Sequence, residues 1–285
     1  MAKLQGPMVK RRKIGRELLT LRETSGLTIE EAGTAIGRSD STISRIENGK
    51  RDVQLIELKG LLEAYEAPAE TREALLNMHS ASPEEAWWTD FDLPPNLDTY
   101  VGLEAEAATL RVYALGSVHS LLRSEDYARA VLRGGNPSAP AGEIETLLKF
   151  HMHRQQVLTR EATPLDLIAV LDEASLWRQV GGLDCQRDQL RHLIEQAEQV
   201  PSITLQVLPY SKGAHSALNG AFTILDFPDP TEPAVVYVDS PGGNLYLQKA
   251  RDTRRFDQSH SRLRGMALDE ADSVAFMKTV LKEIK

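Results

Sequence analysis

The sequence predicts a multidomain protein, with an all-α head of five helices followed by an α+β body that contains a mixed or antiparallel sheet. Its length of 285 residues favours two domains. Short amphipathic segments separated by single glycines fill residues 1–81, which indicates helices. Beyond residue 165, short aliphatic runs alternate with turn residues, which indicates strands. We expect the head over residues 1–81, a connection over residues 82–98 and the body over residues 99–285.

Charge is distributed unevenly along the chain. The whole sequence has 33 Lys and Arg and 41 Asp and Glu, a net charge of −8. Residues 1–51 hold 11 basic and 6 acidic residues, a net of +5, so the remaining residues hold 22 and 35, a net of −13. A basic head on an acidic body is expected when only the head meets a polyanion. Chance composition of a basic tail over residues 1–13 explains the charge equally well.

Composition excludes several classes of protein. Hydrophobic residues make up 41% of the chain and charged residues 26%, which is too apolar for wholesale disorder. No apolar run approaches the roughly 18 residues that a membrane span needs, so we expect no membrane partner and a cytoplasmic location. The single cysteine, Cys185, cannot form an internal disulfide or a cysteine-rich zinc site.

The first two helices of the head have clear start and stop signals. The first carries Ile14 and Leu18 on one side and ends at Gly26. Thr28 and Glu31 have the spacing of a capping box, which opens a second helix that runs through residue 36.

A glycine turn leads to the third helix. Gly37 makes this turn, and Ser39 is expected to be the N-cap of a helix over residues 40–48. Asp52 opens a fourth helix, and a fifth covers residues 70–78.

Prolines and tryptophans over residues 83–95 mark the connection, and Trp87 and Trp88 indicate that it packs on a surface. In the body we expect helices over residues 104–122, 125–132, 143–159, 186–199 and 269–281, and strands over residues 165–171, 203–208, 221–227, 234–238 and 245–247.

The third helix carries the pattern of a DNA-reading element. A rotation of about 100° per residue places Ile43, Ile46 and Glu47 on one side and Ser41 and Arg45 on the other. The apolar side must pack inward, so the outward side presents groups that suit base edges and phosphates. The expected DNA-contacting residues are Ser39, Asp40, Ser41, Thr42, Ser44, Arg45, Lys50 and Arg51.

Glu47 lies on the buried side of this helix. A carboxylate there needs a partner, and Arg22 near the end of the first helix is a suitable one. The alternative is that Glu47 reaches solvent.

Gly26-Leu27-Thr28 and the run GRSDSTISRIENGK over residues 37–50 closely resemble the five-helix repressor-type helix-turn-helix of phage repressor and Cro proteins, the XRE family. The resemblance covers about residues 14–80. It implies that Arg22 and Glu47 form a structural ion pair, that residues 40–45 lie in the recognition helix, and that positions after Gly49 touch phosphates. Ile29 stands where phage members often have Gln, which puts a phosphate contact there in doubt. Asp40 also stands where Gln is common; it could accept from N4 of cytosine or cap the helix, and near phosphates it costs affinity.

The body resembles a second family. LLRSEDYARA over residues 121–130 is similar to a segment of an actinobacterial domain of unknown function found behind such heads, in WhiJ-like and antitoxin-like regulators. The resemblance covers about residues 98–280 and implies a sensory or partner-binding body, often encoded beside a small partner protein. His119-Ser120 replaces the usual Pro-Gly, so the preceding helix is expected to run on.

Side chains that suggest an enzyme have simpler interpretations. His151 and His153 would lie on nearly opposite sides of a helix and could not chelate one ion. His215 and Ser216 are adjacent, which seldom suits a nucleophile and its base. The remaining candidates are better explained by helix capping at Asp172-Glu173, a turn at Gly242-Gly243, a buried thiol at Cys185, and a solvated helix face at Arg251, Arg254 and Arg255, which alternatively form an anion-binding patch. We expect no catalytic residue, no metal site and no cofactor.

Residues and resemblances together predict a sequence-specific DNA-binding transcriptional regulator, a repressor, that is not an enzyme. Its expected partners are double-stranded DNA with a palindromic operator, a second copy of the chain, and a small regulatory protein encoded nearby or a ligand, bound by the body. The alternatives are an antitoxin-like protein that chiefly neutralises a small partner, and an enzyme domain tethered to DNA.

Overall fold

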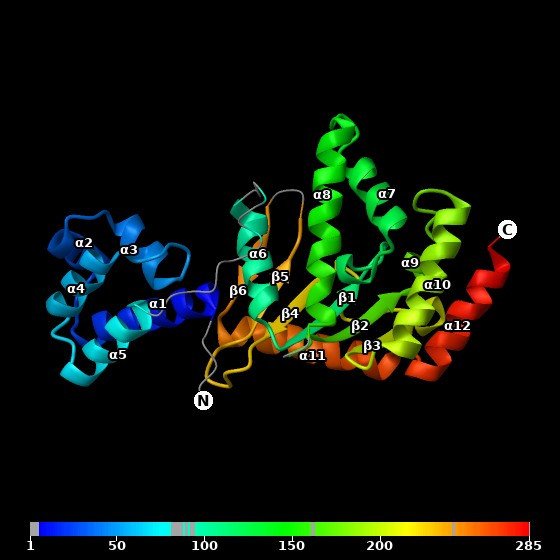
Figure 1. The fold of residues 1–285 in the computed structure, drawn as a ribbon. Coiled ribbons are helices and arrows are strands. Elements are labelled where there is room, and N and C mark those ends of the chain that lie inside the picture. Colours follow the sequence, from blue (N-terminus) through cyan, green and yellow to red (C-terminus); the bar gives the residue numbers. More distant parts are fainter. Residues whose placement is uncertain are drawn as a thin grey trace. The chain divides into compact units, whose positions relative to one another are not determined.

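The structure, a computed structural model, describes residues 6–80, 88, 91, 95–160, 163–240 and 243–284. The chain divides into two compact units, residues 1–106 and residues 107–285. Figure 1 shows the helices of the first unit and the sheet with its helices in the second. The fold class predicted from the sequence is confirmed: an all-α helix-turn-helix head precedes an α+β body with a mixed sheet. None of the described helices is long and apolar enough to cross a membrane.

Within its described residues, the first unit contains the five expected helices and one more. The helices are α1 (Pro7–Thr24), α2 (Ile29–Ile36), α3 (Asp40–Glu47), α4 (Leu55–Ala64), α5 (Ala69–Ser80) and α6 (Pro95–Glu106). Leu18, Ile43, Ile46 and Leu61 are almost fully buried in a core shared by α1, α3 and α4. The apolar side assigned to the third helix is therefore the side that packs inward.

Helix α1 begins earlier than the sequence indicates, so the prediction of a basic tail over residues 1–13 is wrong for residues 7–13. These residues are helical, with Pro7 in the first turn. The backbone N–H groups of Met8 and Val9 donate to the carboxylate of Glu106, at 2.7 and 2.6 Å. This cap comes from a residue almost one hundred positions away, so no local pattern announces it.

Two boundaries near the connection also differ from expectation. Residues 95–98, assigned to the connection, belong to α6, and α6 lies in the first unit rather than in the body. Trp88 is buried and lies against Gly102 of α6, while Trp87 and Pro83 are outside the described residues.

Helix α4 begins at Leu55 rather than at Asp52. Its N-cap is Gln54, which forms a capping box with Glu57. Val53 precedes the helix and packs into the core from the connecting segment.

The second unit is built on a six-stranded mixed sheet in the order β3-β2-β1-β4-β5-β6. β1 pairs in parallel with β2, and β2 with β3, whereas β4, β5 and β6 continue the sheet in antiparallel pairs. The strands are β1 (Thr109–Ala114), β2 (Asp166–Asp172), β3 (Ile203–Leu208), β4 (Phe222–Asp226), β5 (Val235–Val238) and β6 (Leu245–Leu247). The five predicted strands are thus present, with ends displaced by at most one residue.

Strand β1 contradicts the expected helix over residues 104–122. α6 ends at Glu106, the strand follows, and a short 3-10 helix, η2 (Ser120–Leu122), comes after it, with His119 at its start. Leu110 and Val112 are buried between β2 and β4. Pairing on both edges outweighs the helical propensity of the alanine-rich sequence around it.

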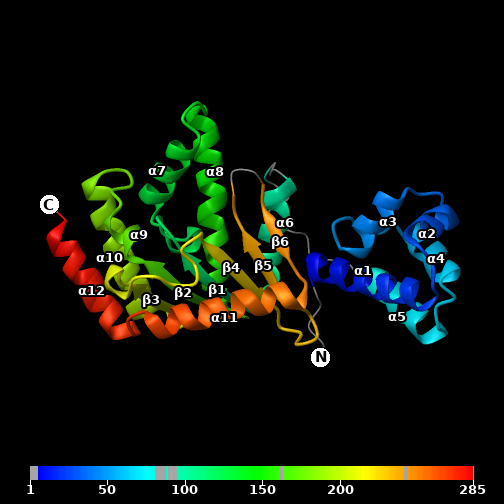
Figure 2. The same ribbon diagram turned by 180° about the vertical axis from the view of Figure 1, so that it is seen from behind.

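Helices cover the sheet. α11 crosses it and contacts β1, β3, β4 and β5, and Figure 2 shows this helix running along the sheet. α7 and α8 pack on each other through Ala128, Leu132, Ile144 and Leu148. The helical segments are α7 (Glu125–Gly135), α8 (Ala141–Arg154), η3 (Gln155–Leu158), α9 (Glu173–Trp177), α10 (Leu183–Gln199), η4 (Tyr210–Lys212), α11 (Ala250–Met266) and α12 (Glu270–Glu283).

Candidate nucleic-acid interface

Helices α2 and α3 are joined by a tight turn. Thr28 and Glu31 form the predicted capping box at the start of α2. Gly37 ends the helix in the left-handed conformation, with φ of 66°, which a side chain would disfavour. The N–H of Arg38 donates to the carbonyl of Gly33 at 2.8 Å, and α3 starts two residues later. The local sequence therefore fixes the angle at which α3 leaves α2.

Close contact with α1 holds α3 in place. A Cβ atom on Gly15 would lie 2.4 Å from the carbonyl oxygen of Ile46 and 2.8 Å from that of Glu47. Only a glycine lets the two backbones approach so closely. Gly15 was not predicted, because its signal in the sequence is no more than a glycine inside a helical pattern.

The outward side of α3 carries most of the predicted DNA-contacting residues. Asp40, Ser41 and Arg45 are exposed, and Thr42 and Ser44 beside them are half-buried. Nε of Arg45 donates to the carbonyl oxygen of Ser41 at 3.2 Å, so the side chain lies back along the helix. Its Nη1 and Nη2 groups have no hydrogen-bond partner among the residues that the structure describes, and they are available to a base edge or a phosphate.

Ser39 stands at the N-cap position of α3 but does not cap it with its side chain. Its hydroxyl lies 3.0 Å from the hydroxyls of both Ser41 and Thr42, and it accepts no backbone N–H. Ser39 is therefore the N-cap residue that the sequence predicts, but its side chain makes no capping hydrogen bond. The side chain of Ser39 therefore does not satisfy the first N–H groups of α3. These groups lie at the exposed start of the helix, where binding of an anion is favoured.

Arg22 and Glu47 form a buried, bidentate ion pair. Nε of Arg22 lies 2.7 Å from Oε1 of Glu47, and Nη2 lies 3.1 Å from Oε2. Nη1 donates to the carbonyl oxygen of Leu27 at 2.9 Å, at the corner between α1 and α2. Hydrogen bonding to Glu47 raises the pKa of Arg22 above its ordinary value. The pair therefore joins α1, the α1–α2 corner and α3 inside the unit.

A second charged cluster, which was not predicted from the sequence, lies around Glu57. Its Oε1 accepts from Nε of Arg38 at 2.6 Å and from Nη2 of Arg51 at 3.0 Å. Burial raises the pKa of Glu57, but hydrogen bonds from Gln54, Arg51 and Arg38 lower it below its ordinary value. The positive charge of Arg51, which is predicted to contact phosphate, is thus partly neutralised by Glu57. Lys50 next to it is exposed.

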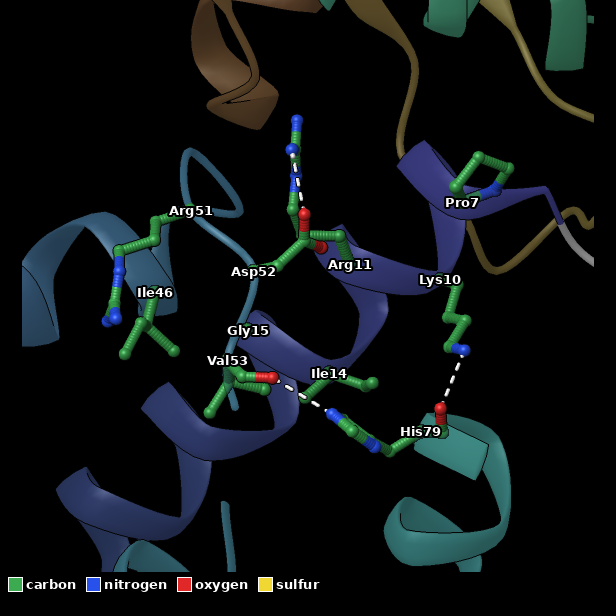
Figure 3. A pocket seen from close by; sticks show the side chains of 10 residues that line it. All are labelled: Pro7, Lys10, Arg11, Ile14, Gly15, Ile46, Arg51, Asp52, Val53 and His79. Carbon is green, nitrogen blue, oxygen red and sulfur yellow. Dashed lines mark hydrogen bonds and ion pairs between the residues drawn. The ribbon is translucent and has the colours of Figure 1, made fainter. Parts of the chain in front are cut away.

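A pocket of about 220 Å³ lies beside the segment that follows α3 (Figure 3). Nε2 of His79 lies 2.9 Å from the carbonyl oxygen of Val53, and Nζ of Lys10 donates to the carbonyl oxygen of His79 at 2.8 Å. Arg11 and Asp52 form an ion pair at 3.5 Å. These contacts fasten the segment that carries Lys50 and Arg51 to α1 and α5.

The body residues weighed for catalysis have structural partners. Oδ1 of Asp172 caps α9 by accepting the N–H of Ala174 at 2.9 Å, and Oδ2 accepts the hydroxyl of Tyr113 at 2.9 Å. Glu173 accepts from the indole N–H of Trp177 and from the N–H of Tyr210. The capping interpretation of this pair is confirmed.

His215 and Ser216 point to different places. His215 faces Tyr113, with ring centroids 5.5 Å apart, whereas the Ser216 hydroxyl lies 2.7 Å from that of Ser259. They do not form a nucleophile–base pair. Across the part of the chain that the structure describes, no three His, Cys, Asp or Glu side chains gather where they could hold a metal ion.

The turn between α2 and α3, the buried packing side of α3 and its polar outer side define the first unit as the helix-turn-helix domain of a DNA-binding regulator. A family described as a helix-turn-helix domain matches residues 13–75. A second family, described as a domain of unknown function (DUF5753), matches residues 97–279, which is more than half of the chain. The chain belongs to this second family. No curated protein matches the chain.

Proposed function

We propose that this protein is a sequence-specific transcriptional repressor of the XRE type, in which α3 lies in the major groove of an operator. Ser41 and Arg45 read base edges, Asp40, Thr42 and Ser44 flank them, and the start of α3 at Ser39 seats a phosphate. Lys50 and Arg51 contact the DNA backbone from the segment after α3.

One observation carries the proposal: packing fixes the inner side of α3, and its outer side is exposed to solvent. Its inner side packs through Ile43, Ile46 and the Arg22–Glu47 pair, while Ser41 and Arg45 are exposed. A reading helix must be positioned in this way, because base contacts are specific only when the backbone that presents them is fixed.

The body, in this proposal, supplies dimerisation and regulation and does no chemistry. A single small head makes too little contact for tight specific binding, whereas two heads on a palindrome, with half-sites about 34 Å apart, reach useful affinity. As in the WhiJ-like and antitoxin-like regulators that the body resembles, the regulating partner is a small protein encoded nearby or a ligand. The proposed location is the cytoplasm.

The test begins with a genome-wide binding map of the intact protein, which yields the operator and its symmetry. Arg45→Ala is then expected to weaken binding to the operator by roughly 1–3 kcal/mol, with little change on random DNA, because it removes a base contact. Lys50→Ala is expected to weaken both alike and to lower the salt slope by about one unit, because it removes a phosphate contact. Fluorescence anisotropy over a range of salt concentrations measures both effects.

Arg133→Ala is the matched control. Arg133 is an exposed arginine of α7, in the other unit, and its loss removes the same charge. It is expected to leave both affinities unchanged. Equal losses on operator and random DNA for Arg45→Ala would show that this residue does not read sequence.

A further inference from the structure

A second pocket lies within the body, between the loop that precedes β4 and one side of α11. Its volume is about 400 Å³. Ser216 and Phe222 line it from the loop and the start of β4, and Arg255, Phe256, Ser259 and Arg262 line it from α11. None of the DNA-contacting residues named above belongs to it.

The rim of this pocket is cationic. Arg255 and Arg262 are seven residues apart, so two helical turns place both on the same side of α11. Both are exposed, and no ion pair or hydrogen bond joins either one to another residue that the structure describes. No Asp or Glu is among the described residues that line the pocket. Two like charges facing one cavity without a carboxylate favour an anion there.

The floor of the pocket is aromatic. The rings of Phe222 and Phe256 meet edge to face, with centroids 5.0 Å apart and an interplanar angle of 68°. Phe222 is buried in the core on this side of the sheet, and Phe256 packs against that core. A ligand that enters between the arginines therefore meets apolar rings below them.

Two neighbouring residues of the loop that forms one wall are held by side-chain contacts. The Ser216 hydroxyl lies 2.7 Å from the hydroxyl of Ser259, which ties the loop to α11. His215, the preceding residue, is buried against Tyr113 and Asp172 at the ends of β1 and β2. These ties hold the wall in place without a ligand, so binding costs little ordering of the loop.

We propose that this pocket binds a small organic anion, with the anionic group between Arg255 and Arg262 and an apolar ring over Phe222 and Phe256. The proposal deepens the regulatory role proposed for the body, and rests on it for its biological meaning, because it assigns the ligand class and the place where the ligand binds. The binding itself is independent of DNA.

The test is isothermal titration calorimetry of the full-length protein with phenyl phosphate. We expect saturable one-to-one binding, and about 10- to 100-fold weaker binding to Arg255→Gln/Arg262→Gln, because two charge-assisted contacts are lost. Arg251→Gln/Arg254→Gln removes the same charge from the same helix outside the pocket and is the matched control. Inorganic phosphate, which lacks the ring, is expected to bind at least about tenfold more weakly than phenyl phosphate.

Three results would overturn the proposal: no saturable binding of phenyl phosphate, equal weakening in both double variants, or equal affinity for phosphate and phenyl phosphate. The titration contains no DNA, so its failure leaves the operator measurements untouched. Conversely, if the protein binds no operator but binds phenyl phosphate in the expected pattern, the ligand pocket stands and the proposed regulatory role does not.

Discussion

At the scale of single residues, the buried charges of the first unit depend on their partners. Arg22 and Glu47 are 8% and 3% exposed, and each satisfies the other through two hydrogen bonds. A buried ion pair adds little net stability when compared with well-packed apolar side chains, but removal of one partner strands the other charge. Loss of one partner is therefore expected to destabilise the unit more than loss of both.

Arg22→Met is expected to lower the free energy of unfolding of the first unit by about 3–5 kcal/mol, because Glu47 is then buried without a cation. Arg22→Met/Glu47→Leu, which removes both charges, is expected to recover most of this loss. Chemical denaturation followed by circular dichroism measures the three proteins. A single variant no less stable than the double variant would contradict the role assigned to the pair.

The two charged clusters also show what the sequence can predict at this scale. Glu47 falls on the same helical side as Ile43 and Ile46, so period alone places it inward and creates the need for Arg22. Glu57 gives no such signal for its two arginines. Arg38 and Arg51 lie in turns, where no period applies, and only the folded path of the chain brings them to one carboxylate.

At the scale of elements, local signals placed most helices and strands, and distant contacts decided the rest. The capping box at Thr28 and the turn at Gly37 involve neighbours along the chain, so they were predictable. The start of α1 depends on Glu106, and β1 exists because β2 and β4 pair with its two edges. Such partners cannot be identified from a local sequence window.

The cap on α1 predicts a pH response of the first unit. Burial raises the pKa of Glu106 to about 7, although the N–H groups of Met8 and Val9 and the nearby Arg11 and Arg12 favour the charged form. The folded state therefore holds a proton that the unfolded chain releases near its ordinary pKa of 4.5. The contribution of Glu106 to stability is greatest below that value and is lost as the pH rises through about 7.

Glu106→Gln keeps an acceptor for the helix and removes the titration. Relative to this variant, the wild-type protein is expected to lose protection of residues 7–24 as the pH rises from 5 to 8. Hydrogen exchange compared between the two proteins at each pH measures the difference, since the intrinsic pH dependence of exchange cancels. A constant difference across this range would contradict the raised pKa.

At the scale of the whole molecule, net charge distinguishes the first 51 residues from the rest of the chain. Residues 1–51 carry a net charge of +5 although the chain as a whole carries −8. The net charge of the whole chain taken alone argues against DNA binding. The basic segment becomes visible when the charges are counted separately along the chain. The positive charge is carried largely by a helix, α1, and by the turns that flank α3.

Dimerisation belongs to this scale, because it concerns how many heads meet one operator. We expect light scattering to show a dimer at micromolar concentration, in the presence of operator if not without it, because one head makes too few contacts for tight specific binding. A monomer under both conditions would contradict the binding of two heads to a palindromic operator.

Operators with chemically altered bases test whether Arg45 reads a base in the major groove. Replacing single guanines by 7-deazaguanine removes one major-groove acceptor and leaves Watson–Crick pairing intact. We expect that at one guanine of each half-site this change weakens binding of the wild-type protein about tenfold and leaves binding of Arg45→Ala unaffected. If every such change affected both proteins equally, Arg45 would not read a guanine of the operator.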